Sequence, residues 1–378
     1  TRVSRIELEA ERDELRAEIA RLEELLASEQ KIRELVSEEM DATAEKYGTP
    51  RRTLLTEAAP SIAPAGRGKK AAVSLEIADT PCVVLLSTTG RALRVDLAAD
   101  AAIERPSRRS KHDAIQSEIR ATSRGELGAV TSAGRLVRFT PVDLPAAPPN
   151  SVQLGAGARI SDYLPLAKNE RVIALVSLTS DLPIAIGTRS GTVKRVANGY
   201  PNRPDFEVIS LKQGDEVVGV VQVTEAAELV FVSAGAQLLH FPASAVRPQG
   251  VTAGGMAGIN LATGDRVVFF GAVLKPEHAV VVTVSTGAAT LAGADPGRAK
   301  VSLFIDFPGK GRATGGVRAH SFLKGEESLA LGWVGVDPAH ALGPDGSVRT
   351  LPDPGAKRDA SGVPIDALID SIGSPLGG

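Results

Sequence analysis

Residues 131–139 read TSAGRLVRF, a small polar turn with a glycine followed by a short apolar segment that carries arginines. The pattern recurs as STTGRALRV (87–95), TRSGTVKRV (188–196), VSAGAQLLHF (232–241), VSTGAATL (284–291) and GPDGSVRTL (343–351). Glycine supplies the positive φ that such turns need. We therefore predict β-hairpins that turn at Gly90, Gly134, Gly191, Gly235, Gly287 and Gly346.

A second pattern lies between the hairpins, a polar turn that leads into an apolar strand. It occurs as KNERVIALV (168–176), KQGDEVVGV (212–220), ATGDRVVFF (262–270) and KGEESLALG (324–332). Repeats of roughly 50 residues with four short strands each are typical of radial β-arrays. The alternative is a β-sandwich, but six copies of one pattern favour a mainly β fold with six propeller-like blades.

The N-terminal region has a different period. Residues 4–47 contain no proline or glycine, and Leu15, Ile19, Leu22 and Leu26 follow heptad steps of 4, 3 and 4. This spacing predicts one long helix of a coiled-coil arm that ends at Gly48 and Pro50. A solvated helix packed on one neighbour is the alternative.

These patterns divide the chain into four parts. We expect a coiled-coil helix at 1–48, a linker at 49–70, the six-bladed domain at 71–351 and a partly flexible tail at 352–378. A short helix is expected in the tail at PIDALID. A strand at 71–77 is expected to pair with the last blade and so close the ring.

The composition of the chain excludes several classes of protein and of binding site. The 378 residues carry a formal charge of −2, and 43% hydrophobic content with 23% charge excludes a largely disordered chain. Only 3% of residues are aromatic, which argues against stacking on single-stranded nucleic acid. The single cysteine, Cys82, excludes a disulfide framework, and we expect it to pack in the core. The five histidines lack the spacing of a metal site. Without an apolar run long enough for a membrane span or signal peptide, a cytoplasmic protein is expected.

Several motifs together resemble the A subunit of bacterial type IIA topoisomerases. The helical stretch and the closing EKYGTPRRT (45–53) are similar to the end of that family's coiled-coil arm. The segments GGMAGINLATGDRVV (254–268) and GRATGGVRAHSFLKGEESLALG (311–332) resemble blades of the β-pinwheel C-terminal domain found in DNA gyrase and topoisomerase IV.

The resemblance implies partners as well as a fold. It implies duplex DNA, a second A subunit bound through the arm, and the ATPase B subunit, with a nucleoid-associated location. It implies no cofactor for this region, because ATP and Mg²⁺ act elsewhere in the whole enzyme. The family cleaves DNA with the tyrosine of an Arg-Tyr pair, and Tyr47, Tyr163 and Tyr200 do not match. No catalytic residue is therefore expected here.

The resemblance also separates two functions. Gyrase members carry a QRRGGKG box for tight DNA wrapping, and the corresponding stretch here is RPSRRSKHDAI (105–115). Arg108, Arg109 and Lys111 match the box in charge, but Ser110 and His112 stand near expected glycines. This favours topoisomerase IV, with relaxation, decatenation and chromosome segregation, over supercoiling by gyrase. A propeller-like protein-interaction module with a dimerisation arm is the alternative of another class.

We predict that DNA bends around the rim of the blades through phosphate contacts, which position the duplex without reading its sequence. The expected contacts are basic residues on the second hairpin strands and in the loops: Arg91, Arg94, Arg108, Arg109, Lys111, Arg135, Arg138, Lys194, Arg195, Arg312, Arg318 and Arg349. His240 is the weaker counterpart in the fourth blade, and Arg298 and Lys300 are possible substitutes in the fifth.

Overall fold

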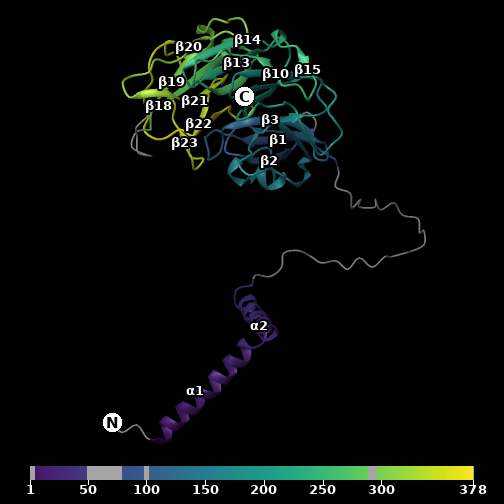
Figure 1. The fold of residues 1–378 in the computed structure, drawn as a ribbon, viewed down its shortest axis with the longest axis vertical. Helices are drawn as coiled ribbons and strands as arrows, with labels where there is room; N and C mark the ends of the chain where they lie inside the picture. The colour runs from purple at the N-terminus through teal and green to yellow at the C-terminus, as the bar shows by residue number, and fades with distance from the viewer. Residues whose placement is uncertain (1–4, 49–78, 98–101, 288–295, 378) are drawn as a thin grey trace, which may run out of the picture. The chain divides into compact units, whose positions relative to one another are not determined.

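The computed structural model describes residues 5–48, 79–97, 102–287 and 296–377 (Figure 1). The chain divides into two units, Thr1–Val73 and Ser74–Gly378. The predicted linker at 49–70 and the strand predicted at 71–77, with its pairing, lie outside the described residues.

The first unit contains two helices, α1 (Arg5–Leu26) and α2 (Glu29–Tyr47), so the prediction of one long helix is wrong. The chain breaks at Ser28, which is extended at φ −131° and whose hydroxyl accepts from the Lys31 amide at 3.4 Å. Serine is a preferred N-cap, so it begins a new helix there. The helix ends at Gly48 as predicted, but with φ −63° instead of a left-handed conformation.

The heptad side chains of this unit are exposed. Leu15 is 58% and Leu26 76% accessible, so the described residues show no partner for the predicted coiled-coil seam. Neither α1 nor α2, nor any other helix in the described residues, is long and apolar enough to cross a membrane.

The second unit consists of six sheets in its described residues. From the inner strand outward, the first holds β3 (Ile115–Thr122), β1 (Pro81–Ser87), β2 (Arg91–Asp96) and β6 (Ala146–Ala147), with β7 (Ala158–Arg159) also on β2. The second holds β8 (Val172–Ser177), β4 (Leu127–Thr131), β5 (Arg135–Phe139) and β11 (Asp205–Glu207). The third holds β12 (Val217–Gln222), β9 (Ile184–Thr188), β10 (Thr192–Val196) and β15 (Pro248–Gln249), with β16 (Met256–Ala257) on β10.

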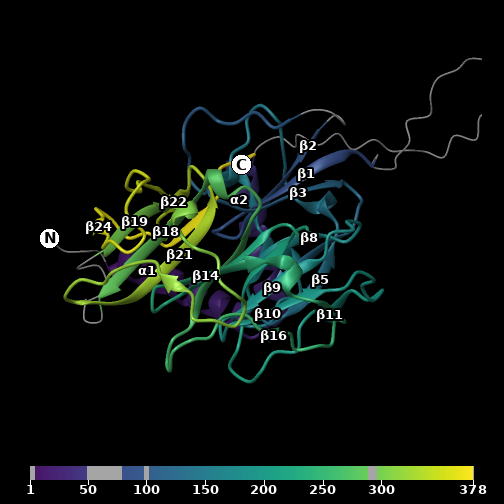
Figure 2. The same cartoon turned by 90° about the horizontal axis from the view of Figure 1, so that it is seen from above.

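The remaining three sheets repeat this order. The fourth holds β17 (Val267–Val273), β13 (Glu228–Ser233), β14 (Gln237–Pro242) and β20 (Val317–Arg318). The fifth holds β21 (Glu326–Val336), β18 (Ala279–Gly287), β19 (Arg298–Leu303) and β24 (Val363–Pro364). The sixth holds β25 (Ser371–Gly373), β22 (His340–Leu342) and β23 (Val348–Arg349). The inner strands contact one another in sequence, so the predicted six-bladed arrangement is confirmed (Figure 2).

Neighbouring blades exchange strands. After the hairpin β4–β5 of the second sheet, the chain passes back to pair β6 and β7 with β2 of the first sheet. It then returns as β8 to its own sheet. The same path places β11, β15, β20 and β24 on the sheet before their own hairpin. We call each such excursion a donated segment.

Apolar cores fill the seams between sheets. Along β1, Val84 and Leu86 pack with side chains of the second sheet, whereas Val83 and Leu85 pack on the opposite face. Successive strand residues point to opposite faces, and both faces here are covered by protein. This explains why strands such as CVVLLS are apolar throughout. Cys82 is buried in one of these cores as predicted.

The hairpin turns differ in two blades from the prediction. Gly90, Gly134, Gly191 and Gly346 have positive φ, but in the fourth blade Ala236 takes this conformation at φ 59° instead of Gly235. Gly287 ends β18 instead of forming a tight turn, and residues 288–291 of that repeat lie outside the described residues.

The C-terminal residues close the ring. Ile115 on β3 and Ser374 exchange backbone hydrogen bonds of 2.8 and 3.0 Å. The predicted partly flexible tail instead supplies β24 and β25, and PIDALID forms no helix because Ile365 and Ile369 are buried between the fifth and sixth sheets. The spacing of four residues between Ile365 and Ile369 therefore places both side chains in the core between two sheets and not on one face of a helix.

We expect Gly191→Ala to destabilise the domain more than Gly264→Ala. Both glycines have positive φ, 86° and 81°, so each variant is strained at the backbone by about 1–2 kcal/mol. A Cβ at Gly191 would lie 2.8 Å from the Ile259 carbonyl oxygen, whereas Gly264 has open space within 4 Å. Urea unfolding should show the larger loss for Gly191→Ala. Equal losses would contradict a close packing of this turn on the donated segment.

Candidate nucleic-acid interface

The basic residues on the second hairpin strands bind backbone carbonyls. Arg94 Nη1 donates to the carbonyls of Pro141, at 3.2 Å, and Val142, at the 3-10 helix η1 (Pro141–Asp143). Arg195 Nη1 donates to Ala243 at 3.2 Å and Val246 at 3.1 Å, at η4 (Ala243–Ala245). The Pro141 and Ala243 carbonyls also accept from the cap amides of Leu144 and Val246, so each arginine adds a further donor at the end of a 3-10 turn. The two arginines therefore hold equivalent donated segments in the first and third sheets.

The second and fourth sheets repeat this contact with variations. Arg138 Nη2 donates to the Pro201 carbonyl at 2.9 Å, and Arg138 also pairs with Glu126 at 2.7 Å. His240 Nε2 lies 2.9 Å from the Phe307 carbonyl, so this nitrogen carries the proton. The sequence correctly identified these residues as register equivalents. We predicted that these residues share the role of contacting phosphates. In the structure their shared contact is with backbone carbonyls of the donated segments.

Two lysines are buried in the same way. The Nζ of Lys194 donates to the carbonyls of Val208, Val251 and Ala253, each at 2.8 Å. Lys300 Nζ donates to the carbonyls of Lys357 at 3.1 Å and Arg358 at 2.5 Å. Burial lowers the pKa of both lysines to about 8. Lys194 is fully buried and Arg195 is 3% accessible, so these two side chains are not open to the phosphate contacts predicted for them.

Four further predicted contacts are also engaged inside the domain. Arg91 Nη1 donates to Gly157 at 2.7 Å, Arg349 Nε to Leu368 at 3.1 Å and Arg312 Nη1 to Ala257 at 2.5 Å, all at carbonyl oxygens. Arg135 binds the carboxylates of Glu170, at 2.8 Å, and Asp205. Its charge is therefore offset by two acidic groups.

The polar turn before each inner strand, expected from the sequence, also binds the hairpin of its own sheet, and this contact is the feature that the sequence reasoning missed. In the second sheet Asn169 has φ 67°, and the next residue, Glu170, accepts from the Thr131 hydroxyl of the hairpin turn at 2.6 Å. Asp215, Asp265 and Glu326 make the corresponding contacts with Ser190, Gly235 and Ser285 in the next three sheets. The recurring Gly-Asp, Asn-Glu and Gly-Glu pairs in the sequence could have revealed it.

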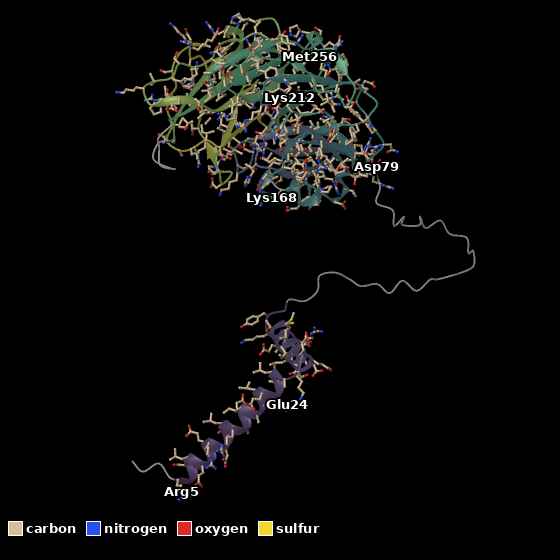
Figure 3. All side chains as sticks on the ribbon, viewed as in Figure 1. Arg5, Glu24, Asp79, Lys168, Lys212 and Met256 are labelled. Atoms are coloured by element: carbon tan, nitrogen blue, oxygen red, sulfur yellow. The ribbon has the colours of Figure 1, made fainter. Side chains whose placement is uncertain are left out.

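Exposed lysines lie in these turns. Lys111, Lys168 and Lys324 directly precede the left-handed residue in the first, second and fifth sheets, and Lys212 lies in the equivalent turn of the third. All four side chains are exposed, and Figure 3 labels Lys168 and Lys212 on the β unit. Because each turn packs on the hairpin turn of its own sheet, the four lysines occupy the same end of their blades.

The loop at 105–113 divides its basic residues between two roles. Arg109 pairs with Asp113 at 2.7 Å and donates to the Ala341 carbonyl of the sixth sheet at 3.1 Å. His112 has φ 67°, and its amide donates to the Gly346 carbonyl at 2.9 Å. Arg109 and His112 therefore hold the sixth sheet against the first, while Arg108 and Lys111 are exposed. Lys111 lies 3.6 Å from Asp345.

Of the twelve predicted contacts, the side chains of Arg108, Lys111 and Arg318 are exposed to solvent. Arg318 lies on β20, the outermost strand of the fourth sheet, and Arg159 occupies the corresponding outer strand β7 of the first. With the turn lysines they form what we call the outer basic set: Lys111, Arg159, Lys168, Lys212, Arg318 and Lys324.

The strand-swapped ring of six sheets defines the second unit as a β-pinwheel. Solved structures have this fold: the C-terminal domain of DNA topoisomerase IV matches with a TM-score of 0.61 and 19% identity over 79% of this chain and 94% of that one. The DNA gyrase A C-terminal domain matches with a TM-score of 0.53 and 17% identity over 77% and 97%.

Sequence comparisons agree with the fold. Residues 227–273 match the family model described as DNA gyrase C-terminal domain, beta-propeller. The DNA gyrase A protein of Salmonella typhimurium is 29% identical over 77% of this chain, and that of Helicobacter pylori is 31% identical over 68%. The chain covers 32% of the length of each relative. It belongs to the type IIA topoisomerase A subunits, of which it carries the C-terminal domain.

The Arg135–Glu170 pair predicts a pH dependence of stability. The hydrogen bond from Arg135 lowers the pKa of Glu170 from 4.5 to about 2. Because the folded pKa lies below the unfolded one, the stabilisation is complete above about pH 5 and is lost as the pH falls toward 2. We expect Glu170→Gln to lower the free energy of unfolding by about 1–3 kcal/mol at pH 7, with the difference shrinking at low pH.

Urea unfolding at several pH values measures this effect. Glu207→Gln, which changes an exposed carboxylate on β11, is the matched control and should leave stability nearly unchanged. A pH-independent loss in Glu170→Gln would show that packing, and not the charge pair, is responsible.

Proposed function

We propose that the β-pinwheel binds duplex DNA along the outer basic set and bends it, guiding the duplex for strand passage by a type IIA topoisomerase. The observation that carries this proposal is the repetition of exposed lysines at one end of the blades, in Lys111, Lys168, Lys212 and Lys324. Lysines that track phosphates supply sequence-independent affinity. Smooth bending of a short site costs on the order of 1–6 kcal/mol, so contacts from several blades must act together.

Within this class we propose a topoisomerase IV role in relaxation, decatenation and chromosome segregation. The support is the loop at 105–113, where Arg109 is paired with Asp113 and bound to the sixth sheet. Ser110 and His112 also stand near the positions where the gyrase box has glycines, which would let a backbone approach phosphate closely. A gyrase role is the second candidate, because the relatives named above are DNA gyrase A proteins.

The remaining partners follow from the same proposal. The exposed heptad residues of α1 and α2, such as Leu15 and Leu26, would pair with a second copy of the chain. The B subunit would supply ATP hydrolysis. Strand cleavage would use a tyrosine outside this chain, since Tyr47, Tyr163 and Tyr200 do not lie in an Arg-Tyr pair.

Salt-dependent duplex binding tests the proposal. We expect a variant with Lys111, Lys168, Lys212 and Lys324 replaced by glutamine to bind more weakly, because four phosphate contacts are lost. The slope of log affinity against log salt should fall by about 3–4 between about 50 and 200 mM salt. Fluorescence anisotropy of a labelled duplex measures both quantities.

The matched control replaces Arg5, Arg12, Arg21 and Arg33 on α1 and α2 by glutamine, which removes the same charge from the other unit. Its slope should stay close to that of the parent. Equal effects in the two variants would overturn the assignment of the interface to the turn lysines.

Ligation of a nicked plasmid in the presence of the chain separates the two candidate roles. Binding without a change in linking number is expected for the topoisomerase IV role. A positive shift in linking number would show chiral wrapping and replace it with the gyrase role.

A further inference from the structure

A cavity of about 220 Å³ lies at the seam between the first and sixth sheets. Its apolar wall includes Ile115, Val152, Leu154 and Leu376, and Arg105 and Arg108 are among its polar lining residues. Val152 and Leu154 come from the donated segment between β6 and β7, and none of the apolar lining residues is among the DNA contacts proposed above.

The cavity follows from the way the ring closes. The other seams are packed by buried side chains from both flanking sheets, as where Val130 and Ile186 meet between the second and third. Val83 and Leu85 belong to the core on the face of the first sheet that points away from the second sheet. Of the described residues in that core, Leu376 is the one buried residue from the C-terminal segment beside the sixth sheet. The sixth sheet has three strands in its described residues and shows no donated outer strand. Too few apolar side chains therefore reach this seam to fill it.

Charge at the cavity is unbalanced. The Arg109 guanidinium is neutralised by Asp113 at 2.7 Å. Arg105 donates to the Gly377 carbonyl, which carries no net charge, and Arg108 has no hydrogen bond or ion pair within the described residues. Two cationic groups therefore lie beside an apolar cavity, and no carboxylate in the described part of the chain pairs with them.

His340 also lines the cavity, and its Nδ1 lies 3.5 Å from the Asp113 carboxylate. His340 Nδ1 donates to the Asp113 carbonyl oxygen at 3.1 Å, which fixes the proton on that nitrogen. Burial, reinforced by Arg109, lowers the pKa of His340. The polar edge of the cavity thus presents two guanidinium groups that no carboxylate of the described residues pairs with, an arrangement suited to an anion with an apolar body.

We propose that this cavity binds a small aromatic carboxylate, with its rings against Ile115, Val152 and Leu376 and its carboxylate at Arg105 and Arg108. An apolar cavity of about 150 Å³ takes up benzene, so about 220 Å³ accommodates two fused rings. Guanidinium groups bind carboxylates with paired, charge-assisted hydrogen bonds. The ligand contacts residues on both sides of the closing seam, so its binding stabilises the closed ring.

Titration of the whole 378-residue chain with 2-naphthoate tests this site, using ¹⁵N NMR and calorimetry in the absence of DNA. We expect saturable one-site binding, with the largest amide shifts at Ile115, Val152 and Leu376. Neutral 2-naphthamide should bind about tenfold more weakly, because it forms no ion pair with the arginines.

Variants identify the anion-binding groups. Arg105→Ala/Arg108→Ala should weaken naphthoate binding about tenfold, and Arg108→Glu alone should weaken it at least as much. The control, Arg318→Ala, removes an exposed arginine from the fourth sheet and should leave naphthoate binding unchanged. Equal affinity for the amide and the acid, equal loss in Arg318→Ala, amide shifts on other blades, or no saturation would each overturn the site. These results are independent of duplex binding, so they leave the proposed DNA interface to its own test.

Discussion

The ring depends on cationic side chains that bind carbonyls of the donated segments. The donated strands are short, since β6, β15 and β20 have two residues each, so ladder hydrogen bonds alone give little attachment. Arg94, Arg195 and Lys194 add hydrogen bonds to carbonyls that β pairing leaves free. A cation buried without acceptors would be costly, and a buried carbonyl without a donor would be too. The buried cation and the backbone carbonyl satisfy each other's hydrogen-bonding groups. These bonds therefore hold each donated segment in register on the neighbouring sheet.

This arrangement separates the basic residues of the β unit into two populations. One population lies on the second hairpin strands and is bound to protein, as Arg195 is at 3% accessibility. The other lies in the turns before the inner strands and on the outermost strands, as Lys168 and Arg318 do, and is open to solvent. The first gives the ring its stability, and the second gives it a surface on which an anionic polymer can lie. The loop at 105–113 joins the two roles, because Arg109 closes the ring beside the exposed Arg108.

The sequence predicts the hairpins and the number of blades because both are local. A short apolar run and a turn at Gly134 or Gly191 involve only neighbouring residues. It does not predict the destination of the donated segments, which is a contact between residues far apart in the chain. An arginine such as Arg94 has the same local sequence whether it faces phosphate or the carbonyl of Val142. The break at Ser28 was readable as an N-cap, but the absence of proline and glycine from residues 4–47 concealed it.

The most direct test of this account compares Arg195→Met with Arg318→Met. For Arg195→Met it predicts a loss of about 2–4 kcal/mol in the free energy of unfolding, because the Val246 carbonyl loses its buried donor and the Ala243 carbonyl keeps only the Val246 amide. Amides of the donated segment 243–249 should exchange faster, while the salt slope of duplex binding stays unchanged. Arg318→Met should instead keep its stability within about 0.5 kcal/mol and reduce that slope. An Arg195→Met variant with parental stability and a reduced salt slope would contradict the account.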